Sequence, residues 1–504
     1  MSLIPVEILR LVFGLLSKDK KSLRSCLLVN RPWCESVVSI LWNDPFQFLK
    51  DPSYSIIQTL ISCLNESELK ILQNRGINID NVIINRPTFD YVAFMRHLKY
   101  VNLYDSTSIW LLQILGQDGK NDPLSFFVTR ELCKLIMNRC KTLLTLSIST
   151  EGMVTFIDEN DYVSIPCFPG ASNSLSLLQE FKCCGAFDKK IIFKTMAKLC
   201  RNIRYLNIDY YLDDRRTAAP LELVKLIKSQ QALIEFKLAI FDRVSDIVSA
   251  LKSQEKSLTD LEFRGIEFED DVTFESIINC KNLKSFSLLS CDNVTNKTLE
   301  PLATATFPNL KTFIFKILPK PPIAVSSFIR SNCISLQELI LDWQQITDPV
   351  DDPEIIETII EHCPNITTFD AHLKIPQQLI PFLRACTELR KLTVHGKERV
   401  VADELLPQLG PLIPAKLFKL NICAIWTFTP SALQEFLDTC IAPLEFIGIR
   451  ECYDITDEHL DILSRYAEKG TLKYLNIKAA SRITKEGLDN ICSVVDVIEH
   501  GDPS

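Results

Sequence analysis

A short apolar pattern recurs from Leu98 onward: an apolar residue, two residues of any kind, a second apolar residue, one further residue, and a third apolar residue. The last two apolar positions alternate with their neighbours as in a short strand with one buried face, and the next dozen residues have helical spacing. In the clearest copies a cysteine stands three positions earlier: Cys200/Ile203/Leu206/Ile208, Cys280/Leu283/Phe286/Leu288, Cys333/Leu336/Leu339/Leu341, Cys363/Ile366/Phe369/Ala371 and Cys386/Leu389/Leu392/Val394. Further copies begin at Leu143, Leu178, Leu233, Leu258, Leu310, Leu417, Leu444 and Leu472.

Successive copies after Ile203 begin about 23 to 30 residues apart, which is the period of a strand–helix solenoid. Neither layer of one unit can bury its apolar side alone, so neighbouring units must stack. The pattern predicts an α/β fold over residues 98–495, with a curved parallel sheet and helices on its convex side. Spacing is irregular between 98 and 260, where the segments 117–123 and 151–176 are predicted loops; residues 496–504 are a predicted tail.

The first 45 residues have apolar positions three and four apart in three stretches, which polar segments separate. Three helices are therefore expected, and Pro5 suits the first helical turn because its missing N–H has no partner there. Apolar residues occupy more than one helical face. A unit this short cannot bury all of these apolar residues. One helical face is therefore expected to dock on another protein or on the rest of the chain.

The order Leu3-Ile4-Pro5-x-Glu7-Ile8-Leu9 with Val12-Phe13, then Leu23-x-x-Cys26-x-x-Val29-Asn30-Arg31-x-Trp33, closing on Leu41-Trp42, resembles the F-box, in particular the fungal F-box-like type. This resemblance covers residues 1–45. It implies a module that binds the Skp-type adaptor of a cullin-RING ubiquitin ligase. The contact set it implies is Leu3, Pro5, Ile8, Leu9, Phe13, Leu16 and Leu23, whereas Trp33 and Trp42 are expected inside the unit. The alternative is that these apolar residues attach an N-terminal cap to the repeats.

Residues 46–97 are a predicted helical connector, because apolar residues from Ile56 to Leu72 have helical spacing and Pro52 and Gly76 flank them as stop signals. Some repeats continue with cysteine or a small residue and then Val/Ile-Thr-Asn/Asp or a near relative, as in 291–296, 452–457 and Ile483-Thr484-Lys485. This resembles the cysteine-containing class of leucine-rich repeats. The threonines are expected to cap the helices by accepting from free backbone N–H groups.

Residues that flank the buried strand positions should point away from the helices, into the concave face of the sheet. That face is the expected surface for a protein partner, because exposed aromatic and charged side chains supply anchors there. The candidate substrate-binding residues are Tyr205, Asp209, Arg264, Asp342, His372, His395, Arg450 and Tyr474.

The formal charge of -8 and pI of about 5.5 argue against a nucleic-acid partner. No run of about 18 uninterrupted apolar residues occurs, so no membrane partner is predicted. The eighteen cysteines are dispersed in a chain that is 47% hydrophobic, and we interpret them as reduced core residues, with one of Cys183 and Cys184 facing outward. These features favour a cytoplasmic or nuclear location.

No C-x-x-C pair, H-E-x-x-H motif or glycine-rich nucleotide loop is present, so no metal or cofactor is predicted and the chain is not expected to be an enzyme. The predicted function is the substrate-recognition subunit of a Skp-cullin-F-box ligase, with a cullin recruited through the adaptor and an unknown protein substrate. The alternative is a leucine-rich-repeat scaffold or inhibitor unrelated to ubiquitin transfer. A cysteine-dependent enzyme would be inactivated by alkylation.

Overall fold

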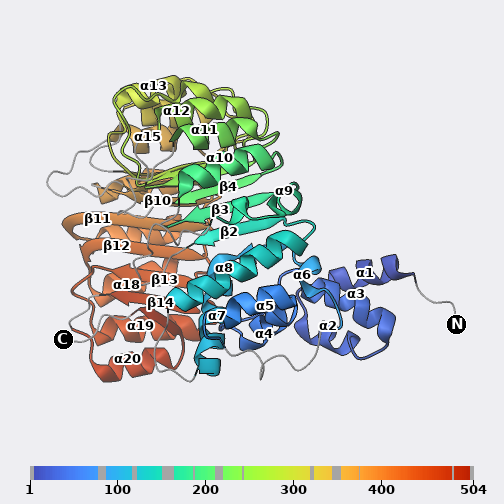
Figure 1. Ribbon diagram of the computed structural model, residues 1–504. Coiled ribbons are helices and arrows are strands. Elements are labelled where there is room, and N and C mark those ends of the chain that lie inside the picture. The colour runs from blue at the N-terminus through green and yellow to red at the C-terminus, as the bar shows by residue number, and fades with distance from the viewer. Residues whose placement is uncertain are drawn as a thin grey trace. The chain divides into compact units, whose positions relative to one another are not determined.

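The computed structural model describes residues 5–77, 87–115, 122–149, 164–185, 188–209, 220–240, 243–317, 323–342, 353–373, 375–478 and 482–499. The chain divides into two compact units, 1–258 and 259–504. Within each unit, helices lie along one side of a stack of parallel strands (Figure 1). No described helix is both long and apolar enough to cross a membrane.

Three short helices open the first unit, as the spacing predicted: α1 (Val6–Leu15), α2 (Lys20–Cys26) and α3 (Arg31–Leu41). Polar residues start two of them, because the side chains of Asp19 and Asn30 accept hydrogen bonds from the first-turn N–H groups of α2 and α3. The helices enclose a small core of their own, formed by Leu9, Phe13, Leu23 and Val37.

Trp33 and Trp42 flank that core rather than fill it, since both side chains are half-buried. The Trp33 ring meets the Phe13 ring edge-on at 5.0 Å between centroids. The Trp42 ring lies 4.5 Å from the ring of Tyr91, beyond the three helices. Aromatic contacts of this kind favour one arrangement of the helices and tie α3 to the next segment.

The connector contains two main helices where the spacing suggested one, α4 (Tyr54–Ser62) and α5 (Glu66–Gln73). The break has a local cause: Asn65 and Glu68 form a capping box that starts a new helix. Gly76 follows α5 with φ +84°, a conformation that favours glycine, in agreement with its predicted role as a stop signal. The short α6 (Tyr91–Phe94) completes the segment.

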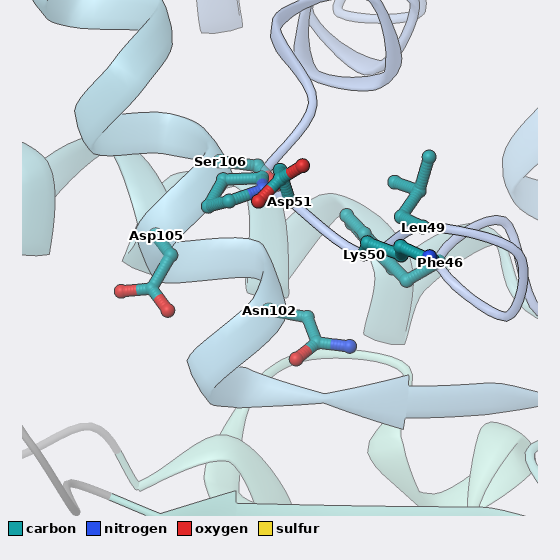
Figure 2. A pocket seen from close by; sticks show the side chains of 8 residues that line it. Phe46, Leu49, Lys50, Asp51, Asn102, Asp105 and Ser106 are labelled. Carbon is teal, nitrogen blue, oxygen red and sulfur yellow. The ribbon is translucent and has the colours of Figure 1, made fainter. Parts of the chain in front are cut away.

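A hydrogen bond and a small cavity mark where the connector meets α7 (Tyr100–Leu115). The backbone N–H of Ser53 donates to Oγ of Ser106 at 2.9 Å. Beside this bond lies a cavity of about 120 Å³, whose lining comes from residues 46–52 on one side and from Asn102, Asp105 and Ser106 of α7 on the other (Figure 2). The connector is thus held against the first repeat by direct contacts.

Five strands of the first unit are parallel neighbours in chain order: β1 (His97–Lys99), β2 (Thr145–Ser149), β3 (Glu180–Cys184), β4 (Tyr205–Asp209) and β5 (Glu235–Ala239). The helical segments between and after them are α7, α8 (Asp122–Arg139), η2 (Ile165–Cys167), α9 (Ala171–Ser174), α10 (Lys189–Leu199), α11 (Pro220–Ser229), α12 (Ser245–Ala250) and η4 (Leu251–Gln254).

Ten strands of the second unit also follow chain order: β6 (Asp260–Arg264), β7 (Ser285–Cys291), β8 (Thr312–Ile317), β9 (Glu338–Asp342), β10 (Thr368–His372), β11 (Lys391–Val401), β12 (Lys419–Thr427), β13 (Phe446–Arg450), β14 (Tyr474–Lys478) and β15 (Asp496–Glu499). The helical segments are η5 (Phe274–Ile277), α13 (Asn296–Ala303), α14 (Ala324–Asn332), α15 (Pro353–His362), η6 (Pro376–Gln378), α16 (Leu379–Ala385), α17 (Leu405–Leu409), η7 (Gly410–Leu412), α18 (Pro430–Thr439), α19 (Asp457–Glu468) and α20 (Lys485–Cys492).

The α/β solenoid predicted from the repeat pattern is confirmed. Every predicted copy from Leu143 onward has its strand two residues after the first apolar position, and the alternating positions are buried, as with Leu206 and Ile208 in β4. Thr295 and Thr484 cap α13 and α20 as expected, with their hydroxyls accepting from N–H groups at 3.3 and 3.1 Å.

Two local predictions differ from the structure. Residues 122–123, placed in a loop, begin the long helix α8, and the described part of the second predicted loop contains η2 and α9. The predicted tail begins with strand β15, which pairs parallel to β14 and so adds one more layer of hydrogen bonds to the sheet. Residues 116–121, 150–163 and 500–504 lie outside the described residues.

Neighbouring repeats of the first unit are joined by buried glutamine side chains at the ends of their helices. Gln230 accepts from the N–H of Ile203 at 3.0 Å and donates to the carbonyl of Cys200 at 3.2 Å. One repeat later, Gln254 accepts from the N–H of Leu233 at 3.1 Å and donates to the carbonyl of Ile227 at 2.9 Å. Gln230 occupies the repeat position that Cys200 has in the preceding repeat. The side chain at this position lies next to buried backbone groups of the preceding repeat, which need hydrogen-bond partners.

Replacing Gln230 by leucine should lower the free energy of unfolding by about 2 to 4 kcal/mol, because the N–H of Ile203 and the carbonyl of Cys200 lose their partner in the interior. Urea unfolding followed by circular dichroism measures this change. Gln337→Leu, at an exposed position, is the matched control and should have little effect. Equal stability of the two variants would contradict the bridging role of Gln230.

Candidate functional site

Helix α1 has two apolar faces, and only one of them is buried. Leu9, Phe13 and Leu16 face the core of the three-helix unit. The other face and the end of α2 carry large apolar side chains in contact with solvent: Ile8 (47% exposed), Leu11 (69%), Val12 (49%), Leu15 (87%), Leu28 (86%) and Val29 (56%). We call these six residues the apolar face. So many exposed aliphatic side chains on so small a unit are typical of a docking surface.

The structure divides the predicted adaptor contacts between this surface and the interior. Pro5 and Ile8 are exposed, and Leu16 is partly buried. Leu9, Phe13 and Leu23 are 4%, 2% and 0% exposed, so they support the apolar face from inside and do not form it. Leu3 lies outside the described residues. The prediction did not include the exposed residues Leu11, Val12, Leu15, Leu28 and Val29, because helical spacing groups residues into faces without showing which face is covered.

A second surface lies on the strands of the second unit. Because these strands are parallel and in register, the fifth residue of each lies beside the fifth residue of the next. Across six strands this position holds Lys316, Asp342, His372, His395, Cys423 and Arg450. We call these residues the charged row. At about 4.8 Å between strands it extends over roughly 24 Å.

Two histidine–carboxylate pairs involve the middle of the charged row, and the second includes Asp370, the third residue of β10. Nε2 of His372 lies 2.9 Å from Oδ1 of Asp342, and Nε2 of His395 lies 2.8 Å from Oδ1 of Asp370. The two imidazole rings are 5.0 Å apart. An ionised carboxylate only accepts, so each ring donates its Nε2–H. Both pairs are half-buried, with the side chains of His372 and Asp342 17% and 16% exposed, and the ring orientations are thereby fixed.

The ends of the charged row are cationic. Nζ of Lys316 lies 3.8 Å from Oδ2 of Asp342, while Arg450 stands beside Cys423 in the register. The hydrogen bond from His372, assisted by the charges of His372 and Lys316, lowers the pKa of Asp342 below its ordinary value of 3.8. The row thus presents positive, negative and hydrogen-bonding groups at fixed positions.

The structure brings four of the predicted substrate-binding residues together, since Asp342, His372, His395 and Arg450 all belong to the charged row. Arg264 has the same strand position in β6, where it pairs with Glu262 at 2.5 Å. Tyr474 stands at the opposite end of its strand, 42% exposed. In the first unit, Tyr205 and Asp209 stand at the two ends of β4, and Tyr205 is 41% exposed.

Burial suppresses the acidity of most repeat cysteines. It raises the pKa of Cys200 and Cys386 to about 12, and it also raises the pKa of Cys423 in the charged row. Cys183 is buried and Cys184 is half-buried, as the strand alternation predicted. Among the described residues, no three side chains of histidine, cysteine, aspartate or glutamate are grouped as metal ligands.

Comparison with known proteins found no matching family model and no matching curated protein. Solved structures that are similar to this chain include two leucine-rich-repeat proteins. A leucine-rich-repeat-containing protein of Legionella pneumophila is 14% identical, with a TM-score of 0.33 over 53% of this chain and 90% of that one. A leucine-rich-repeat protein of Leptospira interrogans is 11% identical, with a TM-score of 0.31 over 73% of this chain and 97% of that one. The strand registers within each unit show the parallel repeat fold.

His372→Phe should raise the pKa of Asp342 toward its ordinary value by removing the hydrogen bond that lowers it most. A depressed carboxyl pKa adds stability above the unfolded-state value of about 3.9, and this stability is lost as the pH falls through the folded-state pKa. The wild type should therefore lose more free energy of unfolding between pH 5 and pH 3 than the variant. Urea unfolding at both pH values measures the difference.

Asp342→Asn removes the titrating group and should behave as His372→Phe does, whereas His362→Phe, at the end of α15, should retain the wild-type pH dependence. If the wild type and His372→Phe lose equal stability on acidification, the pair between His372 and Asp342 has no electrostatic role.

Proposed function

We propose that the chain is a substrate-recognition subunit of a Skp-cullin-F-box ubiquitin ligase. In this proposal the apolar face of the N-terminal helices binds the Skp-type adaptor, which brings a cullin. The strand surface of the repeats binds a protein substrate. The observation that carries the proposal is the second apolar face of α1, which lies outside a unit that already has its own core.

The exposed side chains have the spacing that helix docking requires. Ile8, Leu11, Val12 and Leu15 stand at positions i, i+3, i+4 and i+7, so they form one stripe along α1. Leu28 and Val29 follow α2 and are also exposed. An apolar stripe of this kind is matched by a groove between helices of a partner protein. The F-box resemblance of residues 1–45 favours the adaptor as that partner.

The strand surface supports a protein as the second ligand. The charged row offers donors, acceptors and both signs of charge on a rigid sheet, a combination that gives specificity for an extended polar surface. Tyr205 and Tyr474 add exposed aromatic anchors in their respective units. Sites spread along strands suit a macromolecule better than a small metabolite, for which pockets are deeper and more apolar.

The chain would contribute proximity rather than chemistry to ubiquitin transfer. A bound substrate held near the ligase raises the effective concentration of its acceptor lysines. Thiols whose pKa burial has raised, such as those of Cys200 and Cys386, are poor nucleophiles at neutral pH. We therefore propose that the catalytic residues belong to the partner subunits, and that the complex acts in the cytoplasm or nucleus.

A scaffold or inhibitor that has no link to ubiquitin transfer would use the same strand surface. Such a protein would differ from a ligase subunit in one respect, because its apolar face would not bind an adaptor. Adaptor binding therefore separates the two functions.

Leu15→Asp should weaken binding to a purified Skp-type adaptor at least about tenfold, because a carboxylate replaces an aliphatic side chain at the most exposed position of the apolar face. Leu28→Asp should act in the same direction. Titration calorimetry with the full chain measures both affinities. Phe13→Ala is unsuitable for this purpose, since it removes a core residue and so unfolds the module.

Leu221→Asp is the matched control, because this leucine is 59% exposed on α11, away from the apolar face. It should leave the affinity for the adaptor unchanged, and all three variants should keep the wild-type melting temperature. A wild-type chain that does not bind the adaptor, or binds it as well after Leu15→Asp and Leu28→Asp, would exclude the receptor function and favour the scaffold.

A further inference from the structure

A basic cavity of about 360 Å³ lies where the three N-terminal helices meet the first repeat. Its cationic lining comes from three parts of the first unit: Arg10 from α1, Arg96 from the residue before β1, and Lys141 from the segment before β2. Ser39, Asn43, Ala93 and Phe94 complete the lining. No acidic side chain belongs to it.

The three cations are not neutralised within the described part of the chain. None of them forms an ion pair there. Three like charges around one hollow attract an anion and disfavour a further cation. By contrast, some cations on the strands, such as Lys316 and Arg264, stand beside a carboxylate.

Hydrogen bonds hold Arg96 in position. Its backbone N–H donates to the carbonyl of Asn43 at 2.8 Å, and its carbonyl accepts from the N–H of Leu144 at 2.7 Å. Its Nη1 donates to the carbonyls of Ala93 and Met95 at 3.0 and 2.6 Å. These bonds orient the guanidinium group. They use only some of its N–H groups, and the geometry of the planar guanidinium matches the oxygens of a phosphate.

The size of the cavity also suits a ligand. Its volume of about 360 Å³ falls within the usual range for small-molecule sites of about 300 to 1,000 Å³. The cavity thus combines three cations with room for a small anion.

We propose that this cavity binds a small phosphorylated molecule whose phosphoryl oxygens contact Arg10, Arg96 and Lys141. A ligand with two phosphoryl groups fits best, because three formal positive charges exceed what a single monoanion neutralises. Arg10 belongs to α1, whereas Arg96 and Lys141 belong to the first repeat, so the ligand links the N-terminal helices to the repeats. This inference stands apart from the proposed ligase function, since it depends on none of the apolar-face residues.

The full chain is titrated with inorganic pyrophosphate by calorimetry at constant ionic strength. Arg10→Gln and Lys141→Gln are the test variants, because both side chains are exposed and their loss should leave the fold intact. Each should weaken binding about tenfold, the loss expected for one charge-assisted contact. Lys198→Gln, an exposed lysine of α10 outside the cavity, is the control and should bind as the wild type does.

A second titration uses a sugar bisphosphate. Tighter binding than pyrophosphate, lost in the same variants, identifies a phosphorylated organic molecule as the ligand; weaker binding identifies the inorganic ion. The proposal is overturned if neither probe binds, if Arg10→Gln and Lys141→Gln bind both probes as the wild type does, or if Lys198→Gln loses as much affinity as they do. Adaptor affinity, measured separately through Leu15→Asp, tests the ligase function independently of these outcomes.

Discussion

Parallel pairing of strands in a constant register is the constraint on which the remaining features depend. Within each unit, one strand places its second and fourth residues, such as Leu339 and Leu341, against the helices, and its neighbour does the same in step. The buried side chains then stack into a continuous core. Because the register is kept, the outward residues also align, and side chains distant in sequence, such as Asp342 and His372, become hydrogen-bonded neighbours.

The two candidate surfaces arise from opposite circumstances. The charged row is a by-product of regular pairing, since its residues occupy the strand positions that helices do not cover. The apolar face exists because three short helices provide too little volume to bury both sides of α1, so Leu9 and Phe13 are covered and Leu11 and Leu15 are not. A regular sheet thus supplies a polar surface, and a small helical unit supplies an apolar one.

The basic cavity belongs to neither pattern. Its cations come from a helix, from the start of one strand and from the approach to another, and no repeat position predicts them. In the sequence, Arg10 looks like any solvent-exposed residue of a helix. Arg96 looks like any charged residue that precedes a strand. Only the packing of α1 and α3 beside β1 gathers their charges around one hollow.

Sequence alone determined the strand positions, the three N-terminal helices and the caps at Thr295 and Thr484, because these depend on spacing and on interactions between residues close in the chain. It also placed His372, His395 and Arg450 on the open side of their strands by parity. The tertiary structure decided which side of α1 remained exposed, where β15 would add to the sheet, and that Asp342 and Asp370 would pair with histidines of neighbouring strands. Those outcomes depend on contacts between residues far apart in the chain, and periodicity carries no information about such contacts.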